Sequence, residues 1–197
     1  MIKPATTLAI GEAVTIIRRG GIIAFPTETL YGLAVEAINR TALSRLQEVK
    51  GRDMAHTLPI LVADLDMLSV VTATLSSRAP ELVNNHWPGP LTLVLPARAG
   101  LPPQIVSNKG GVAVRISSDP VAAELIRQVG APITATSANI SGYPPATSAA
   151  EACIEGVELV LDDGPRGQRA STVVELLEDG PVVLRQGEIV IEEPSGD

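Results

Sequence analysis

The 197-residue chain is 45% hydrophobic but only 2% aromatic, which predicts a domain with an aliphatic core and excludes intrinsic disorder. Its 15 basic and 22 acidic residues give a net charge of −7, which argues against tight non-specific binding to nucleic acid or anionic membranes. The only cysteine, Cys153, excludes an internal disulfide and a cysteine metal cluster, and the absence of an apolar run of about 18 residues argues against a membrane span, so the expected location is the cytoplasm.

In the first half of the chain, predicted helices and strands alternate. Apolar residues at helical spacing predict a helix around residues 10–17 and a second around 42–49, with Asn39 or Thr41 as the N-cap of the second. Strands are expected at 22–25, 58–63 and 91–95, and further helices at 64–71 and 76–87.

The second half continues the alternation. Strands are expected at 112–116 and 133–136, and Asp119 followed by Pro120 predicts the start of a helix between them. Ser148 and Glu151 form a capping-box pattern that predicts a helix ending near Gly156. Late strands are expected at 159–161, 172–176, 182–185 and 189–191. The pattern predicts one α/β domain over residues 1–197 with a mixed sheet and a flexible tail at 192–197.

Polar residues gather where predicted strands end, which is where ligands bind in open α/β sheets. The segment 26–33, PTETLYGL, carries Thr27, Glu28, Thr29 and Tyr31. These side chains either bind a small polar ligand or form an ordinary turn with threonine capping. The segment 134–142, TATSANISG, likewise either lines a nucleotide or carboxylate site or forms Asx and Ser/Thr turns.

Cations accompany these segments. Lys50 and Arg52 follow a predicted helix, where they suit the helix dipole or form a phosphate clamp. Strand alternation sets Arg115 on the same face as Ala113, and an arginine in so apolar a strand needs an anionic partner, either an internal acid or a ligand. Arg185 is a second arginine on a predicted strand. These four cations and the nearby hydroxyls could bind a polyanion and stabilise the charge that develops during transfer. Although the chain has no phosphate-loop motif, they therefore suit nucleotidyl or phosphoryl transfer.

Seven motifs occur in a fixed order between residues 26 and 189: PTETLYGL, KGR, WPGPLTLVL, VAVRI, TSANISG, STVVEL and LRQGEI. In this order they resemble the YrdC/TsaC family of L-threonylcarbamoyladenylate synthases, in its short single-domain form. The resemblance implies a twisted mixed sheet flanked by helices, with a central basic cavity. It also implies a nucleotidyltransferase that condenses L-threonine, bicarbonate and ATP, with Mg²⁺, to L-threonylcarbamoyladenylate and pyrophosphate. A threonylcarbamoyl-transferase complex would then modify the tRNA adenosine next to the anticodon.

The resemblance also implies residue roles. Thr29 and Arg115 would bind L-threonine. ATP would be bound by Lys50, Arg52, His56, Ser137, Asn139, Thr147, Ser171 and Arg185, and no protein side chain is expected to ligate the metal. The chain departs from the usual family pattern at three positions. His56 stands where asparagine is expected, and Ser117 stands where proline is usual. Leu61 stands where some relatives carry a histidine.

Two alternatives remain open at this stage. One is a double-stranded RNA- or tRNA-binding module in translation or ribosome assembly; the net charge of −7 and the few aromatic residues count against it, although weak RNA binding beside the synthase activity is kept open. The other is a diverged relative with a different small-molecule substrate, which the three departures allow.

Overall fold

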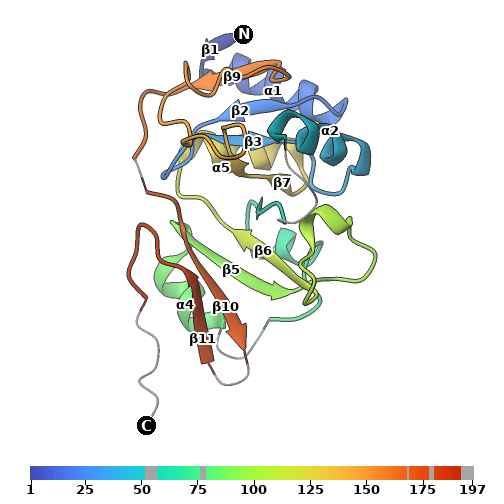
Figure 1. Ribbon diagram of the computed structural model, residues 1–197, viewed down its shortest axis with the longest axis vertical. Coiled ribbons are helices and arrows are strands. Elements are labelled where there is room, and N and C mark those ends of the chain that lie inside the picture. Colours follow the sequence, from blue (N-terminus) through green and yellow to red (C-terminus); the bar gives the residue numbers. More distant parts are fainter. Residues whose placement is uncertain (52–56, 76–78, 168, 178–179, 192–197) are drawn as a thin grey trace.

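The computed structural model describes residues 1–51, 57–75, 79–167, 169–177 and 180–191, and it contains two mixed β-sheets flanked by helices (Figure 1). The helices are α1 (Thr7–Arg18), α2 (Arg40–Lys50), α3 (Leu65–Leu68), α4 (Ala79–His86) and α5 (Pro120–Val129), with a short 3-10 helix at Pro103–Ile105. The strands are β1 (Ile2–Pro4), β2 (Ile23–Phe25), β3 (Gly32–Ala34), β4 (Ile60–Leu61), β5 (Leu91–Pro96), β6 (Gly111–Arg115), β7 (Ile133–Thr134), β8 (Thr136–Ser137), β9 (Leu159–Asp162), β10 (Thr172–Leu177) and β11 (Gly180–Arg185).

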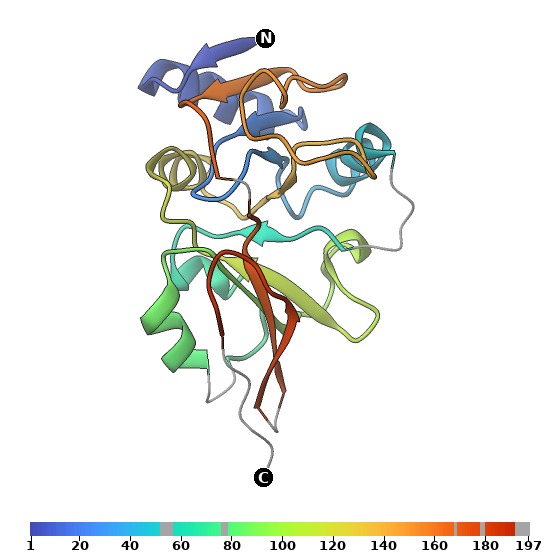
Figure 2. The ribbon, with the colours of Figure 1, turned by 60° about the vertical axis from the view of Figure 1, so that its left-hand side comes forward.

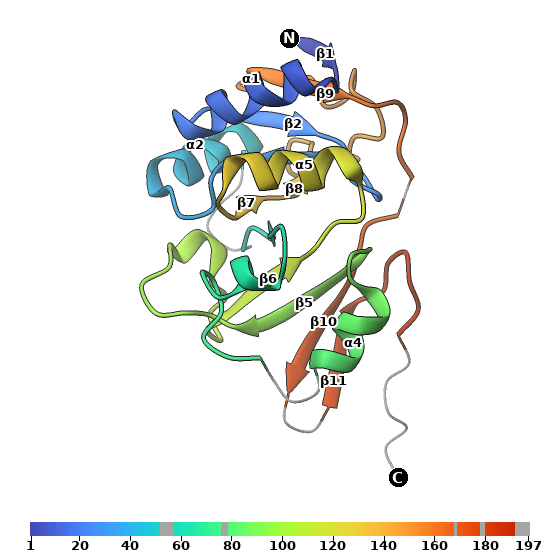
Figure 3. The same cartoon turned by 180° about the vertical axis from the view of Figure 1, so that it is seen from behind.

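The five-stranded sheet has the order β1-β9-β2-β3-β8. Its central strand β2 is buried along its whole length, as expected for a short aliphatic strand covered on both faces. Helices α1 and α5 lie along the same side of this sheet (Figure 3). Their apolar faces form one buried cluster with β2 and β9, in which Ile17, Ile23, Leu125 and Leu159 take part.

The six-stranded sheet has the order β11-β10-β5-β6-β4-β7 and forms the other half of the molecule (Figure 2). Strand β5 is antiparallel to β6 and parallel to β10, which turns back antiparallel as β11. A second buried cluster takes members from both sheets, among them Leu33 of β3, Leu93 of β5 and Val114 of β6. This shared core holds the two sheets together.

Helix capping follows the sequence closely. Asp119 is the N-cap of α5, and its Oδ1 accepts hydrogen bonds from the backbone N–H groups of Val121 and Ala122, at 2.9 and 3.0 Å. Asn39 rather than Thr41 is the N-cap of α2. Helices α5 and α2 end at glycines in the left-handed conformation, Gly130 and Gly51, with φ of 73° and 59°.

The α/β class is confirmed, and the mixed sheet is divided into two. Strand β4 and helix α3 are shorter than predicted. The helix predicted from Ser148 to Gly156 is wrong: the residues form turns, although the Glu151 N–H does bond Ser148 Oγ at 3.3 Å. The capping contact forms, but no helix follows it.

Other differences have non-local causes. The strand predicted at 189–191 is wrong, whereas β1 and β3 were not predicted. Strand β3 lies inside a segment that looks like a polar loop, and it is a strand because it pairs with β2 and β8. The predicted tail 192–197 lies outside the described residues. No helix in the described part of the chain is long and apolar enough to cross a membrane.

Candidate functional site

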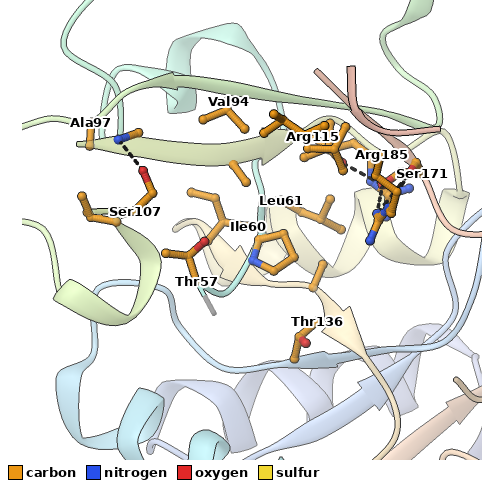
Figure 4. Close-up of a pocket in the computed structure, with 18 of the residues that line it drawn as sticks. Thr57, Ile60, Leu61, Val94, Ala97, Ser107, Arg115, Thr136, Ser171 and Arg185 are labelled. Atoms are coloured by element: carbon orange, nitrogen blue, oxygen red, sulfur yellow. Dashed lines mark hydrogen bonds between the residues drawn. The ribbon is translucent and has the colours of Figure 1, made fainter. Parts of the chain in front are cut away.

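A cavity of about 1290 Å³ is lined by both sheets. Strands β3 and β8 of the five-stranded sheet contribute Gly32, Thr136 and Ser137 to its lining, and the six-stranded sheet contributes residues of β4, β5, β6, β10 and β11. Arg115, Ser171 and Arg185 meet at one end, and Ser107 lies at the opposite end (Figure 4). Lys109 and Glu175, which also line the cavity, form an ion pair at 3.6 Å.

Arg115 is nearly buried and has an acidic partner inside the protein. Its Nη1 donates to Glu28 Oε1 at 2.6 Å and to Thr29 Oγ1 at 3.4 Å. The other carboxylate oxygen of Glu28 accepts a hydrogen bond from Ser117 Oγ. Burial lowers the pKa of Arg115, whereas the charge of Glu28 raises it. The internal-acid alternative is therefore correct, and the cavity face of Arg115 remains able to meet a ligand as well.

The segment 27–30 is both a turn and part of the cavity wall. Thr27 Oγ1 accepts from the N–H groups of Thr29 and Leu30, both at 3.2 Å, and donates to the Leu30 carbonyl at 2.7 Å. Thr27 and Thr29 both line the cavity, and their hydroxyls lie 3.0 Å apart. The turn fixes the Thr29 hydroxyl beside Arg115.

Arg185 projects from β11 into the same end of the cavity. Its Nε and Nη2 donate to the Ser171 carbonyl at 3.2 and 2.9 Å, and Nη2 lies 3.3 Å from Ser171 Oγ. Ser171 Oγ in turn lies 2.8 Å from Thr92 Oγ1. Within the described ranges no acidic side chain forms an ion pair with Arg185. Burial lowers the pKa of this guanidinium.

Lys50 lies behind the cavity wall. Only 1% of the residue is exposed, and its ammonium donates to the carbonyls of Ser137 and Asn139 at 2.6 and 3.1 Å and to Asn139 Oδ1 at 2.8 Å. Ser137 and Asn139 line the cavity, whereas Lys50 is absent from the described lining. In this structure Lys50 shapes the Ser137–Asn139 segment.

A second cavity of about 470 Å³ adjoins the first, since Asn139 and Pro145 line both. Thr147 lies in this second cavity, where its N–H and Oγ1 both bond Glu151 Oε2, at 2.7 and 3.0 Å. These contacts lower the pKa of Glu151, the backbone N–H contributing most. The Glu151 carboxylate thereby fixes Thr147.

The structure brings most of the predicted residues together. Those that line the main cavity are Thr29, Arg115, Ser137, Asn139, Ser171 and Arg185. Lys50 supports the wall, Thr147 lies in the adjoining cavity, and Arg52 and His56 lie outside the described residues. Of the departures, Leu61 lines the cavity and Ser117 bonds Glu28.

Three polar residues make contacts at this site that were not predicted: Glu28, Thr92 and Ser117. Glu28 was visible in the sequence between two threonines, but its pairing with Arg115 spans 87 positions. Thr92 is a single hydroxyl within an apolar strand, and only the pairing of β5 with β10 reveals its neighbours.

The described residues contain no group of three or more histidine, cysteine, aspartate or glutamate side chains that could hold a metal ion. Carboxylate groups are the usual protein ligands of Mg²⁺, which otherwise binds through substrate phosphates. The described residues therefore do not provide a cluster of protein ligands that would by itself hold Mg²⁺.

Comparison with known proteins identifies the group to which the chain belongs. A model of the Sua5, YciO and YrdC proteins, described as telomere recombination, matches residues 15–187. The chain belongs to the Sua5/YciO/YrdC family. This membership agrees with the sequence resemblance and with the α/β architecture.

Individual members of the Sua5/YciO/YrdC family are similar over most of the chain. The threonylcarbamoyl-AMP synthase of Bacillus subtilis is 38% identical over 189 residues, which cover 93% of this chain and 55% of the relative. The enzyme of the same name from Pyrococcus abyssi is 42% identical over 185 residues, or 92% and 54% of the two chains. The chain thus spans about half the length of these curated relatives.

A solved structure of the family has the same fold. The crystal structure of P. abyssi Sua5 complexed with L-threonine superposes with a TM-score of 0.88 at 38% identity, covering 95% of this chain and 56% of that one. The described fold is therefore that of a protein crystallised with an amino acid.

Proposed function

We propose that this protein is an L-threonylcarbamoyladenylate synthase, a nucleotidyltransferase that uses L-threonine, bicarbonate and ATP. The observation that carries the proposal is the end of the cavity where the Glu28-paired Arg115 and the Ser171-bonded Arg185 both face the cavity. Two guanidinium groups beside several hydroxyls suit a reaction in which every substrate carries an anionic group, namely the threonine carboxylate, bicarbonate and the ATP phosphates. Relatives 38% and 42% identical over more than nine-tenths of the chain carry this enzyme name.

Arg115 and Thr29 bind L-threonine in this proposal. Both hydrogen bonds that Arg115 makes to described residues use Nη1, so Nε and Nη2 remain for a bidentate contact with the threonine carboxylate. Glu28 holds the Arg115 guanidinium in place and balances its charge before the carboxylate binds. The Thr29 hydroxyl, fixed by the Thr27 turn, reaches the same ligand.

ATP occupies the remaining wall. Ser137 and Asn139, positioned by Lys50, bind the nucleotide together with Thr147 in the adjoining cavity. Family resemblance assigns Arg52, Ser171 and Arg185 to the ATP phosphates and His56 to ATP binding. We propose that Mg²⁺ arrives on the ATP phosphates, because the described residues offer it no cage of their own.

The proposed reaction has two steps and needs no covalent intermediate with the enzyme. The neutral threonine amine attacks bicarbonate carbon, a nitrogen–carbon bond forms, and the lost hydroxide leaves as water with one amine proton. The resulting carbamate oxygen attacks the α-phosphorus of ATP, and pyrophosphate departs with the electron pair of the broken bond. The side chains bind and orient these anions, and orientation in a site with fixed charges is the expected source of catalysis.

The product would be passed to a threonylcarbamoyl-transferase complex that modifies the tRNA adenosine next to the anticodon. This transfer, the cytoplasmic location and any weak direct contact with tRNA remain predictions.

The proposal is tested with purified protein, ATP, Mg²⁺, L-threonine and bicarbonate. Pyrophosphate release should require both threonine and bicarbonate, and the product should have the mass of threonylcarbamoyladenylate. L-serine and L-valine serve as matched substrates that lack the threonine methyl or hydroxyl group. A folded protein that releases pyrophosphate without threonine, or not at all, would contradict the synthase assignment.

A further inference from the structure

Arg166 lies behind the site, in the segment that joins β9 to β10. It is absent from the described lining of both cavities, and only 14% of its side chain is exposed. Its Nη2 lies 3.1 Å from Oδ2 of Asp119 and 2.7 Å from Oδ2 of Asp163. The side chain of Asp163 is half exposed, so water weakens that pair, whereas Asp119 is buried. The contact with Asp119 is therefore the stronger electrostatic link to the rest of the protein.

Asp119 uses its two carboxylate oxygens for different purposes. Oδ1 caps helix α5, and Oδ2 accepts from Arg166. Burial raises the pKa of Asp119, whereas the Ala122 N–H and the charge of Arg166 act to lower it. The capping contacts would fix the start of the helix without Oδ2, so the contact with Arg166 is additional to the cap.

A chain of hydrogen bonds leads from Asp119 to Arg115. The Asp119 backbone N–H donates to Ser117 Oγ at 3.2 Å, and the Ser117 hydroxyl donates to the Glu28 carboxylate. The other oxygen of that carboxylate accepts from Arg115 Nη1 at 2.6 Å. Hydrogen bonds in a connected network of low dielectric strengthen one another. The guanidinium of Arg166 therefore stands at the outer end of a chain whose inner end is the guanidinium of Arg115.

The backbone around Arg166 is held by contacts that do not use the guanidinium. The Arg166 N–H donates to the Thr147 carbonyl at 2.7 Å, and the Tyr31 hydroxyl donates to the Gly164 carbonyl at 2.8 Å. These bonds survive when the Arg166 side chain is shortened. The contact with Thr147 on the nucleotide side is thus separate from the contact that the side chain makes with Asp119.

We propose that Arg166 is a positioning residue for L-threonine, acting on Arg115 through this chain of hydrogen bonds. The inference rests on the proposed synthase function, in which Arg115 binds the threonine carboxylate. Because the contact with Thr147 uses only the backbone of Arg166, the side chain should influence the binding of threonine and leave that of ATP unchanged.

Arg166→Met tests this role, because methionine keeps much of the apolar stem and removes the guanidinium. The threonine KM should rise about threefold, while the ATP KM and kcat stay within about twofold. A purely structural role would lower the concentration of folded enzyme, which reduces the maximal rate and leaves the threonine KM unchanged. Arg127→Met is the matched control, since Arg127 is an exposed arginine of α5 that pairs with Glu124 of the same helix.

Asp119→Asn tests the same contact from its other side. Asparagine is also a good N-cap, so α5 keeps its cap while the charge that holds Arg166 is removed. The threonine KM should again rise about threefold, and adding Arg166→Met should raise it no further. In the Glu28→Gln background, where the chain is already broken, Arg166→Met should raise the threonine KM by less than about 1.5-fold. Asp119→Asn decides the question alone if Arg166→Met does not fold.

Three results would overturn the role of Arg166 and leave the synthase function intact. They are an unchanged threonine KM in Asp119→Asn, a full additional effect of Arg166→Met in the Glu28→Gln background, and an ATP KM that rises as much as the threonine KM. The last would mean that Arg166 supports the whole cavity wall. A wild-type protein that releases no pyrophosphate with ATP, threonine and bicarbonate would overturn the synthase function, and this inference with it.

Discussion

The Glu28 carboxylate lies 2.6 Å from Nη1 of Arg115, and Ser117 hydrogen-bonds its other oxygen. A buried arginine is costly unless it is paired, and this pair meets that requirement without using Nε or Nη2. The same contact that makes the strand stable therefore presents Arg115 to the cavity in a fixed orientation.

Glu28→Gln should weaken the binding of L-threonine. Glutamine keeps the size of the side chain but removes the charge that orients Arg115, and we expect the threonine KM to rise about tenfold with a smaller change in kcat. Steady-state kinetics with threonine varied measure both. Glu12→Gln, which breaks a half-buried ion pair with Lys3 far from the cavity lining, is the control. An unchanged threonine KM in Glu28→Gln would show that Arg115 needs no such positioning.

Ser117→Ala should act through Glu28. The serine hydroxyl bonds the Glu28 carboxylate and accepts from the Asp119 N–H, so its loss should raise the threonine KM about threefold. In the Glu28→Gln background the same substitution should add little. A double-mutant cycle measures this coupling, and fully additive effects would mean that Ser117 influences the site by another route.

Lys50→Met should destabilise the protein and impair ATP use together. The substitution removes a buried ammonium and leaves its oxygen partners on Ser137 and Asn139 without that donor, which should lower the free energy of unfolding by about 3 kcal/mol. Urea denaturation measures the loss, and the ATP KM reports the altered wall. Lys3→Met is the surface control. If Lys50→Met unfolds with the same free energy as the wild type, Lys50 does not support the wall, and its role would be confined to contact with the ATP phosphates.

Glu151→Gln should change how stability depends on pH. The folded-state pKa of Glu151 lies below its ordinary value of 4.5, chiefly because the Thr147 N–H bonds the ionised carboxylate. Its contribution is therefore complete above about pH 4.5 and is lost as the pH falls through the folded-state pKa. The wild type should exceed Glu151→Gln in free energy of unfolding at pH 7, and the difference should shrink in acid. Glu155→Gln, at an exposed position, is the control. A difference that does not vary with pH would contradict the charge-dependent contact.

The sequence predicts the elements whose signals are local. Helix α5 carries its own cap at Asp119 and its own stop at Gly130. The alternation in β6 correctly sets Ala113 and Arg115 on one face, and the structure shows that this face lines the cavity. Strand β3 depends on pairing with β2 and β8, so its own residues carry no strand signal.

The residues of the candidate site also fall into those that the sequence predicts and those whose roles depend on the fold. Motif residues such as Thr29 and Arg185 were predicted because the family resemblance assigns them, and the cavity brings them together. The roles of Glu28, Ser117 and Thr92 depend on which strands are neighbours. Lys50 shows the limit most clearly: its position in the sequence suggests a phosphate ligand, whereas its burial places it behind the wall.

The central claim is that this protein joins bicarbonate, L-threonine and ATP in one product, and isotope labelling tests it most directly. Wild-type protein is incubated with ¹³C-bicarbonate, unlabelled threonine, ATP and Mg²⁺, and the nucleotide product is analysed by mass spectrometry. The account predicts a threonylcarbamoyladenylate whose mass is raised by a single unit, with the label in the carbamoyl carbon. A threonine adenylate without the label, or no adenylate from folded protein, would contradict it.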